Sequence, residues 1–284
     1  MRNIKQNVTE LIGGTPLVRI NNIEKIENID AELLVKFEAV NPGGSAKDRP
    51  ALNMIAEAEK AGTLKPGGTI IEPTSGNTGV GLAMVAASKG YKAVMVMPET
   101  MSIERRKLLA AYGAEIVLTE GAKGMAGAVS KAEELNKANP NSIIAGQFVN
   151  PANSAAHFAA TGPEIWHDTE GQIDIFVAGI GTGGTITGVG AYLKKQNPKI
   201  KIVAVEPYDS PLLSQGKAGP HGLQGIGANF VPEVLDTNIY DEIITVTTDE
   251  AMGAMKALAQ NEGLFAGITS GAAVNAAIRL AKRP

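Results

Sequence analysis

Short segments rich in β-branched residues alternate with helix-like segments along most of this sequence, and this alternation is the feature that most constrains its fold. Strands that alternate with helices form parallel sheets whose faces the helices cover. We therefore predict an α/β fold. The predicted strands are 31–37, 69–72, 93–97, 115–118, 142–145, 173–178, 200–205 and 243–246, and the predicted helices include 102–112, 125–138, 187–196 and 248–261.

The chain has 284 residues, which is enough for two domains that each bury a core. The best candidate for a crossing between domains is the polar, proline-containing segment 150–153. We expect domains at 1–149 and 150–284, each with a mainly parallel sheet. The first part of the chain, up to about residue 40, can pack on the other half.

Composition argues against several classes of function. The net charge of −3 comes without the clustered basic residues that neutralise phosphates, so we expect no nucleic-acid partner. The absence of cysteine rules out disulfides and thiol chemistry, and the 3 histidines form no apparent metal-binding cluster. The longest apolar stretches, such as 79–87, are too short to span a membrane, and 1–10 is too polar for a signal peptide. We therefore expect a cytoplasmic protein with no membrane partner.

Lys47 lies in a glycine-rich turn, 41–49, between a predicted strand and the start of a predicted helix. A lysine amine that is partly shielded from water, near the positive end of a helix dipole, has a lowered pKa and is a better nucleophile and base. Schiff-base chemistry needs such an amine. Because most single lysines are ordinary solvated side chains, this assignment needs support from elsewhere in the chain.

Two further loops supply that support. The glycine-rich segment 179–185 follows a predicted strand and runs into a predicted helix, which is typical of an anion site where backbone N–H groups face phosphate oxygens. Thr182 and Thr185 add hydroxyl donors there. The segment 74–79 follows another predicted strand, and its hydroxyls, amide and N–H groups suit a carboxylate.

Three other segments carry local predictions. Residues 209–236 are predicted to form a long loop, and long loops in compact domains are usually functional. Residues 247–250 have the spacing of a capping box, so a helix should start there. A hydroxyl at 267–271 precedes an alanine-rich helix, and we expect it to act as a helix cap.

Taken together, these loops resemble those of cysteine synthase (O-acetylserine sulfhydrylase), a family of fold-type II pyridoxal-phosphate enzymes. The resemblance covers nearly the whole chain and implies the tryptophan synthase β-like arrangement of two α/β domains. It also implies pyridoxal 5'-phosphate as the cofactor. The segments that carry the resemblance are 14–18, 41–49, 74–79, 98–107, 162–166, 181–185 and 224–228.

The resemblance assigns roles to individual residues. Lys47 would hold the cofactor as an internal aldimine and, once released, act as the base at the substrate α-carbon. Asn77 would hydrogen-bond the phenolic oxygen of the ring. The phosphate would bind to Gly181, Thr182, Gly183, Gly184 and Thr185, and the substrate carboxylate to Thr74, Ser75, Gly76, Thr78 and Gln147.

Thr269 stands where the family has a serine that bonds the pyridine nitrogen. A neutral hydroxyl cannot keep this nitrogen protonated as a carboxylate would, so the ring is a weaker electron sink. This favours β-elimination and β-replacement over transamination. The implied reaction converts O-acetyl-L-serine and sulfide to L-cysteine and acetate through an aminoacrylate intermediate, with ping-pong kinetics.

The resemblance also implies two protein partners. One is a second copy of the chain in a homodimer. The other is a serine acetyltransferase, whose C-terminal tail enters the active site of enzymes in this family. Docking of that tail without turnover is one alternative to an enzymatic function.

Several features depart from the family pattern, including Ala160, which stands where a threonine is common. Ala46 and Pro50 stand beside Lys47 in place of a valine and an aliphatic residue. Proline lacks an N–H and suits only the first helical turn, so the helix after Lys47 must begin later than Ser45 or be distorted. The chain also stops at Pro284, whereas the family continues with a strand and a glycine-serine loop.

Two other enzyme classes fit part of the sequence. The spacing G-x-G-x-x-G at 179–184 follows a predicted strand, and Glu206 ends the next strand where a nicotinamide-dependent dehydrogenase has its ribose-binding acid. That alternative leaves the loops of Lys47 and Asn77 unexplained. The second alternative class is cystathionine β-synthase, which joins serine to homocysteine on the same scaffold. Against this alternative, the segment 104–107 is more similar to cysteine synthase.

Overall fold

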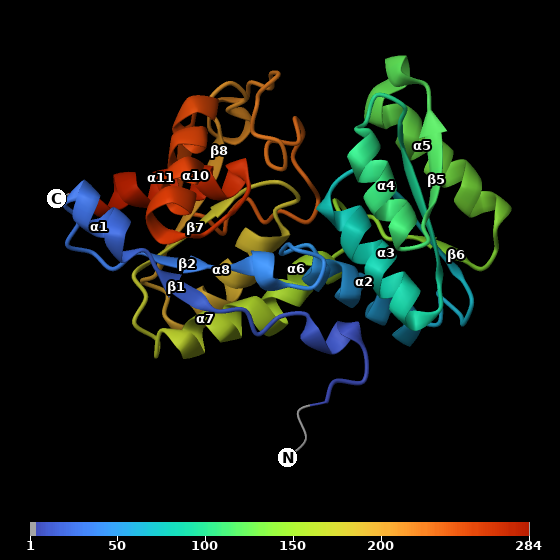
Figure 1. The fold of residues 1–284 in the computed structure, drawn as a ribbon, viewed down its shortest axis with the longest axis horizontal. Coiled ribbons are helices and arrows are strands. Elements are labelled where there is room, and N and C mark those ends of the chain that lie inside the picture. The colour runs from blue at the N-terminus through green and yellow to red at the C-terminus, as the bar shows by residue number, and fades with distance from the viewer. Residues whose placement is uncertain (1–3, 284) are drawn as a thin grey trace. The chain divides into compact units, whose positions relative to one another are not determined.

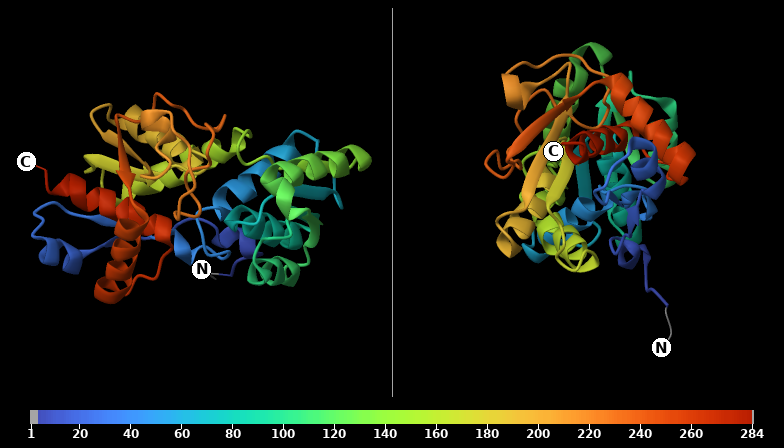
Figure 2. Two further views of the ribbon diagram at one scale, coloured as in Figure 1. Left: turned by 90° about the horizontal axis from the view of Figure 1, so that it is seen from above. Right: turned by 90° about the vertical axis from the view of Figure 1, so that its left-hand side faces the viewer.

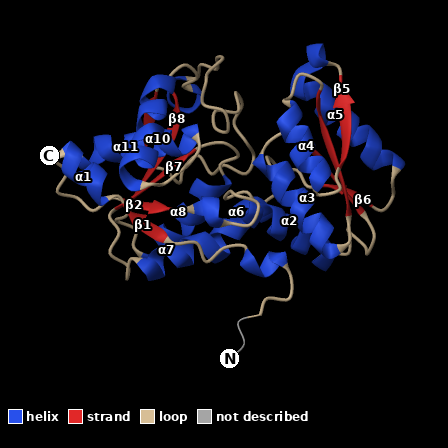
Figure 3. Cartoon of the chain, in the orientation of Figure 1, coloured by secondary structure: helices blue, strands red, loops and turns tan. Residues whose placement is uncertain are grey.

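The structure, a computed structural model, describes residues 4–283. The chain divides into two compact units (Figure 1). The first unit comprises the residues up to Gly14 together with Glu38–Asn153, and the second comprises Thr15–Phe37 together with the residues from Ser154 onward. Each unit has helices packed on a sheet of parallel strands (Figure 3). The protein therefore has the mixed α/β fold that the sequence predicts.

A four-stranded parallel sheet lies at the centre of the first unit. Its strands are β3 (Thr69–Pro73), β4 (Lys92–Pro98), β5 (Glu115–Thr119) and β6 (Ser142–Ile144). In space they follow the order β5-β4-β3-β6. Ile70 of β3 lies opposite Ala93 of β4 on one side and Ile143 of β6 on the other. The central strand β3 is buried along most of its length, as expected for a parallel sheet covered on both faces.

Helices cover both faces of this sheet. They are α2 (Asp48–Lys60), α3 (Asn77–Lys89), α4 (Ile103–Ala111) and α5 (Gly124–Ala138). One core combines residues of α2, α3 and α4 with Ile70 and Met95 of the sheet. A second core places α5 against Ile71 and Val96. Because neighbouring strand residues point to opposite faces, the paired isoleucines of β3 serve one core each.

Helix α3 is buried along most of its length, and many of its residues are small. A Cβ on Gly81 would lie 3.0 Å from the Cβ of Ala51 and 3.1 Å from the carbonyl oxygen of Lys47. The glycine therefore lets α3 pack closely against the start of α2. This contact fixes the backbone position of Lys47 within the first unit.

A three-stranded parallel sheet lies at the centre of the second unit. Its strands, in spatial order, are β7 (Ile175–Gly179), β8 (Lys201–Pro207) and β9 (Glu242–Val246). The helices α7 (Gly162–Asp168) and α8 (Gly184–Gln196) share a core with Ile202. The helices α10 (Thr248–Glu262) and α11 (Ile268–Ala281), orange to red in Figure 2, share a core with Val203. Both faces of this sheet are therefore covered as well.

The second unit also contains an early part of the chain. The strands β1 (Leu17–Arg19) and β2 (Leu34–Lys36) pair antiparallel, and α1 (Asn21–Glu27) joins them. Ile23 of α1 shares a hydrophobic cluster with Leu258 of α10. The short elements of the chain are α6 (Ala152–Ala156), α9 (Leu212–Gln215), the 3-10 helices Val8–Leu11, Glu38–Val40 and Gly121–Lys123, and the π-helix His157–Thr161. Among residues 4–283, no helix is long and apolar enough to cross a membrane.

The predicted elements agree closely with the observed ones. Each predicted strand overlaps a strand of the structure, and the capping box is present because Thr247 and Glu250 bond each other's backbone N–H groups. Helix α2 begins at Asp48, so Pro50 falls in its first turn and breaks no helical hydrogen bond, as predicted.

Two local predictions were wrong. Helix α8 begins at Gly184, three residues earlier than the predicted range 187–196, because Gly183 adopts a left-handed φ of 82° at the N-cap position. The hydroxyl cap predicted within 267–271 is also absent. The N-cap position is occupied by Gly267, no side chain caps the helix, and Thr269 is already its second residue. A capping side chain must come from the extended residue before the first turn.

Candidate active site

Lys47 directly precedes α2, where the chain leaves a tight glycine turn. Gly44 has a φ of 80°, in the left-handed region that favours glycine. The side chain of Lys47 is half-buried. Burial lowers the pKa of its amine, and the nearby carboxylate of Glu38 partly opposes this. A lowered pKa leaves more of the amine neutral, so Lys47 can act as a nucleophile and as a base.

The two residues after Lys47 hold its loop. Asp48 is fully buried, and its carboxylate accepts the N–H of Gly43 at 2.6 Å. A Cβ on residue 43 would overlap that carboxylate, so only glycine fits there. Arg49 is also buried and donates two N–H groups to the carboxylate of Glu38, at 2.7 and 2.8 Å. Burial raises the pKa of Asp48 to about 6. These contacts fix the turn that presents Lys47.

The segment 74–79 links β3 to α3. Thr74 is buried, and its hydroxyl accepts the N–H of Gly76 at 3.1 Å. Asn77 is the first residue of α3 and is exposed. Its Oδ1 accepts a hydrogen bond from Arg105 at 2.8 Å. Because an arginine can only donate, the amide orientation is set, and the Nδ2 of Asn77 remains as a donor for an oxygen ligand.

A buried pair joins two of the predicted carboxylate-binding residues. The hydroxyl of Thr78 donates to Oε1 of Gln147 at 2.6 Å, although the two residues lie far apart in the sequence. Both side chains are buried. The backbone N–H of Gln147 in turn donates to the carboxylate of Glu72, near the end of β3, at 3.2 Å. Ser75, in the same loop as Thr78, is half-buried.

The predicted phosphate loop lies between β7 and α8 in the second unit. Helix α8 has no side-chain cap at its N-cap residue, and the N–H of Gly184 donates to the hydroxyl of Thr182 at 3.3 Å. A Cβ on residue 181 would lie 2.5 Å from the carbonyl oxygen of Gly225, and one on Gly183 would lie 2.6 Å from the Cβ of Leu235. Only glycines can form this tight cradle at a helix N-terminus, where phosphate groups bind.

His157 supports the same loop from the π-helix. One ring nitrogen lies 3.3 Å from the hydroxyl of Thr185, and the other lies 2.9 Å from the hydroxyl of Thr161. The histidine is buried. It therefore holds the Thr185 hydroxyl at the start of α8.

Thr269 lies near the phosphate loop within the second unit. A Cβ on Gly225 would lie 3.5 Å from Cγ2 of Thr269, and the carbonyl of the same Gly225 packs against Gly181. The N–H of Gly227 donates to the carbonyl oxygen of Ile180 at 2.9 Å. The glycine-rich segment 224–227 thus connects the phosphate loop to the start of α11.

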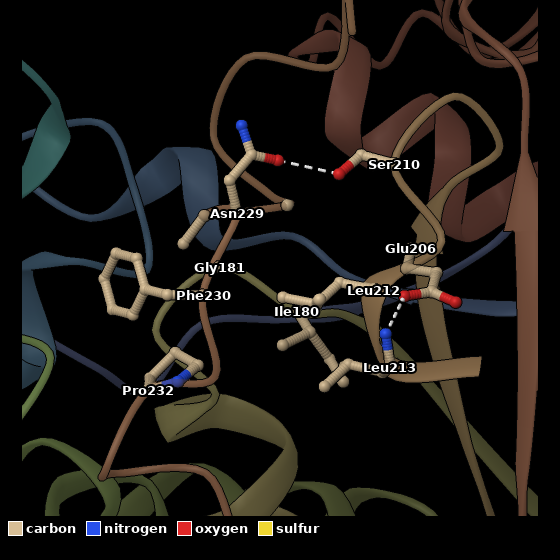
Figure 4. Close-up of a pocket in the computed structure, with 11 residues that line it drawn as sticks. Ile180, Gly181, Glu206, Ser210, Leu212, Leu213, Asn229, Phe230 and Pro232 are labelled. Carbon is tan, nitrogen blue, oxygen red and sulfur yellow. Dashed lines mark hydrogen bonds between the residues drawn. The ribbon is translucent and has the colours of Figure 1, made fainter. Parts of the chain in front are cut away.

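A small pocket with a volume of about 20 Å³ borders the phosphate loop (Figure 4). The polar side chains that line it are hydrogen-bonded to each other or to the backbone. The hydroxyl of Ser210 donates to Oδ1 of Asn229 at 2.7 Å, and the carboxylate of Glu206 accepts the N–H of Leu213 at 2.8 Å (Figure 4). Glu206 therefore holds the start of α9. This role counts against its assignment as the ribose-binding acid of a dehydrogenase.

The residues predicted from the sequence form two groups, one in each unit. Lys47, the loop 74–79 and Gln147 belong to the first unit, and the phosphate loop and Thr269 belong to the second. Sequence reasoning missed the contributions of Glu72, Arg105 and His157. Arg105 lies in a segment that carried the family resemblance, but nothing in the sequence indicated its contact with Asn77.

Comparison with known proteins identifies the family. A family model described as pyridoxal-phosphate dependent enzyme matches residues 8–284. The cysteine synthases of Staphylococcus aureus strains Mu50 and N315 are 57% identical to this chain over 277 residues, which is 97% of the chain and 88% of each relative.

Solved structures agree with that match. A cysteine synthase from Entamoeba histolytica is 45% identical and has a TM-score of 0.96, over 100% of this chain and 84% of the other. An O-ureido-L-serine synthase is 44% identical and has a TM-score of 0.95, over 99% and 88%. Because the family model covers nearly the whole chain and these relatives share its sequence and fold, the chain belongs to the family of pyridoxal-phosphate dependent enzymes.

Proposed function

We propose that this protein is a cysteine synthase, which replaces the acetate group of O-acetyl-L-serine with sulfide and releases L-cysteine and acetate. The observation that carries this conclusion is the 57% identity, over 97% of the chain, to cysteine synthases of Staphylococcus aureus. The enzyme is a transferase of cysteine biosynthesis that depends on pyridoxal 5'-phosphate.

The side chains and backbone of this chain fit the cofactor. The glycines at 181 and 183 let the loop pack closely against Gly225 and Leu235, where a Cβ would overlap, and the uncapped start of α8 offers backbone N–H groups for a phosphate. Lys47 supplies an amine whose pKa is lowered by burial. When bound, pyridoxal phosphate supplies an aldehyde for a lysine amine and an electron sink for the substrate α-carbon.

Lys47 has two tasks in this proposal. Its neutral amine would hold the cofactor covalently and, once displaced by a substrate, would take the proton from the substrate α-carbon. Both tasks need an unprotonated amine, which is what burial favours at this position. The turn held by Asp48 and Arg49 fixes the backbone from which this side chain extends.

The other proposed contacts orient the cofactor and the substrate. The Nδ2 of Asn77 would donate to the phenolic oxygen of the cofactor, and Thr269 would supply a neutral hydroxyl to the ring nitrogen. A neutral hydroxyl does not hold a proton on that nitrogen, which favours replacement at the β-carbon over transamination. The phosphate binds to Gly181, Thr182, Gly183, Gly184 and Thr185, and the substrate carboxylate to Thr74, Ser75, Gly76, Thr78 and Gln147.

We also propose that the enzyme is a cytoplasmic homodimer and that the C-terminal tail of a serine acetyltransferase can bind at its active site. The support for both is the resemblance to cysteine synthases. Light scattering of the purified protein tests the dimer, and a monomer at micromolar concentration would contradict it. Lys47→Ala should lose the covalent cofactor and keep the tail, and loss of both would count against a separable docking role.

An absorbance spectrum of the purified holoenzyme tests the proposed reaction. The visible band of the lysine-bound cofactor should shift when O-acetyl-L-serine is added and return when sulfide follows, with release of L-cysteine. A band that does not shift with O-acetyl-L-serine but does shift with serine would indicate the substrate of cystathionine β-synthase instead. If added pyridoxal phosphate produced no band at all, the proposal would be overturned.

A further inference from the structure

We propose that Arg105 is a positioning residue of the cofactor site, which holds the side-chain amide of Asn77 so that its Nδ2 faces the phenolic oxygen of pyridoxal phosphate. This inference rests on the proposed function, since it takes Asn77 as the contact of that oxygen. Arg105 itself touches neither substrate nor cofactor in this proposal.

The packing of α3 against α4 brings the two side chains together. Asn77 is the first residue of α3, and Arg105 is the third residue of α4. A Cβ on Gly79 would lie 3.5 Å from Cδ2 of Leu109, which is fully buried one helical turn after Arg105. The N-cap hydroxyl of Ser102 accepts the backbone N–H of Arg105 at 3.3 Å. The first turn of α4 is therefore held beside the start of α3.

The hydrogen bond between the two side chains has only one possible direction. Nη1 of Arg105 lies 2.8 Å from Oδ1 of Asn77. An arginine stays protonated and has no acceptor atom, so the amide must turn its oxygen toward the guanidinium and its nitrogen away from it. Within residues 4–283, no other hydrogen bond involves the Asn77 side chain. Both N–H groups of its Nδ2 are therefore donors for a ligand.

The guanidinium of Arg105 is committed to this one contact. Among the described residues, its side chain forms no ion pair and no second hydrogen bond. The next residue, Arg106, differs because it donates to the backbone carbonyl oxygens of Glu99 and, at 2.9 Å, of Met101. Arg105 is half-buried, and no carboxylate neutralises its charge. The charge therefore polarises the Asn77 amide and strengthens its N–H donors, which suits an oxygen that carries negative charge.

A cofactor analogue that lacks the phenolic oxygen, 3-deoxypyridoxal 5'-phosphate, tests this inference at one atom. The variant Arg105→Met removes the donor and the charge but keeps an apolar stem. The affinity of the cofactor-free full chain for pyridoxal phosphate, measured by absorbance titration, should weaken by about fivefold or more, as expected for a lost hydrogen bond. The affinity for the analogue should change by less than about twofold, because the analogue offers no oxygen to Asn77.

Two further variants separate positioning from a general structural effect. Arg106→Met is the matched control, because Arg106 is the neighbouring arginine of α4 and donates to backbone carbonyls instead of to Asn77. It should leave the ratio of the two affinities as in the wild type. In the background of Asn77→Ala, adding Arg105→Met should weaken the binding of pyridoxal phosphate by no more than about twofold, since the residue through which Arg105 acts is already absent.

Three results would overturn the inference. They are wild-type affinity for pyridoxal phosphate in Arg105→Met, an equal loss for pyridoxal phosphate and the analogue, and a loss of the same size with and without Asn77. If Arg105→Met does not fold, Arg105→Gln replaces it, since a shorter and neutral side chain should cause the same selective loss. Failure of the proposed function is a separate outcome, because it is a wild-type protein that prefers pyridoxal phosphate to the analogue but forms no cysteine.

Discussion

Burial gives several side chains of this protein their chemical properties. It lowers the pKa of Lys47, and it raises the pKa of Asp48 to about 6 and of Glu72 to about 7. In each case the low-polarity surroundings disfavour the charged form. A neutral amine suits a covalent cofactor, whereas the two carboxyls are held by backbone N–H groups and organise the loops around them.

Thr269 provides the sharpest test at the scale of one residue. Thr269→Ser keeps a neutral hydroxyl, so cysteine formation should stay within about twofold of the wild type, whereas Thr269→Asp should lower it by about tenfold or more because a carboxylate would keep the ring nitrogen protonated. Initial rates at saturating O-acetyl-L-serine measure both. Equal losses in the two variants would show that the size of the side chain matters and its charge does not.

At the scale of elements, glycines allow helices to pack closely near the helix starts that carry the predicted site residues. Gly81 brings α3 against the carbonyl of Lys47. Gly271 does the same for α11, because a Cβ there would overlap the carbonyl of Ala251 and lie 2.8 Å from the backbone nitrogen of Met255 in α10. Close packing of this kind leaves little freedom for the loops at the helix starts.

A pair of glycine substitutions tests this packing. Gly271→Ala should destabilise the protein by about 1–3 kcal/mol, because α10 and α11 must separate to admit the methyl group. Gly253→Ala is the control, since Gly253 lies in α10 with no atom within 4 Å of its added Cβ. It should stabilise the protein by up to about 1 kcal/mol through helix propensity. Urea unfolding measures both, and a stable Gly271→Ala protein would refute the close contact.

At the scale of the whole molecule, stability should depend on pH in two opposite ways. The pKa values of Glu72 and Asp48 are raised in the folded state. Between about pH 4 and 7 these two carboxyls are therefore ionised in the unfolded chain while the folded protein still holds their protons. Stability from these groups therefore falls as pH rises through that window. The pKa of Glu242 is lowered to about 2 by Arg283 and Lys201, so its contribution is lost only in acid, as pH falls from about 4 toward 2.

Denaturation across pH checks this balance. The urea midpoint of the wild type should be lower at about pH 8 than at about pH 5.5, and Glu72→Gln should reduce the difference because residue 72 no longer titrates. A midpoint that rises over this range would contradict the assigned pKa of Glu72. So would a Glu72→Gln variant whose midpoint depends on pH as strongly as that of the wild type.

Much of the architecture follows from local patterns in the sequence. The period of the apolar residues and the glycine turns correctly predicted the strands, most helices and the start of α2 after Lys47. The hydroxyl cap expected within 267–271 is absent because Gly267, which has no side chain, occupies the extended N-cap position. The early start of α8 was missed because glycine, a poor helix former, opens it through a left-handed Gly183.

The α/β fold, the family and the segments that carry the proposed chemistry could be predicted from the sequence, because these depend on residues close together in the chain. Which side chains meet depends on the folded structure. Arg105 reaches Asn77, and Glu72 and Thr78 reach Gln147, across long separations in sequence. Those contacts depend on the strand order β5-β4-β3-β6 and on helix packing. No local pattern encodes that order, since each strand pairs with residues far away in the chain.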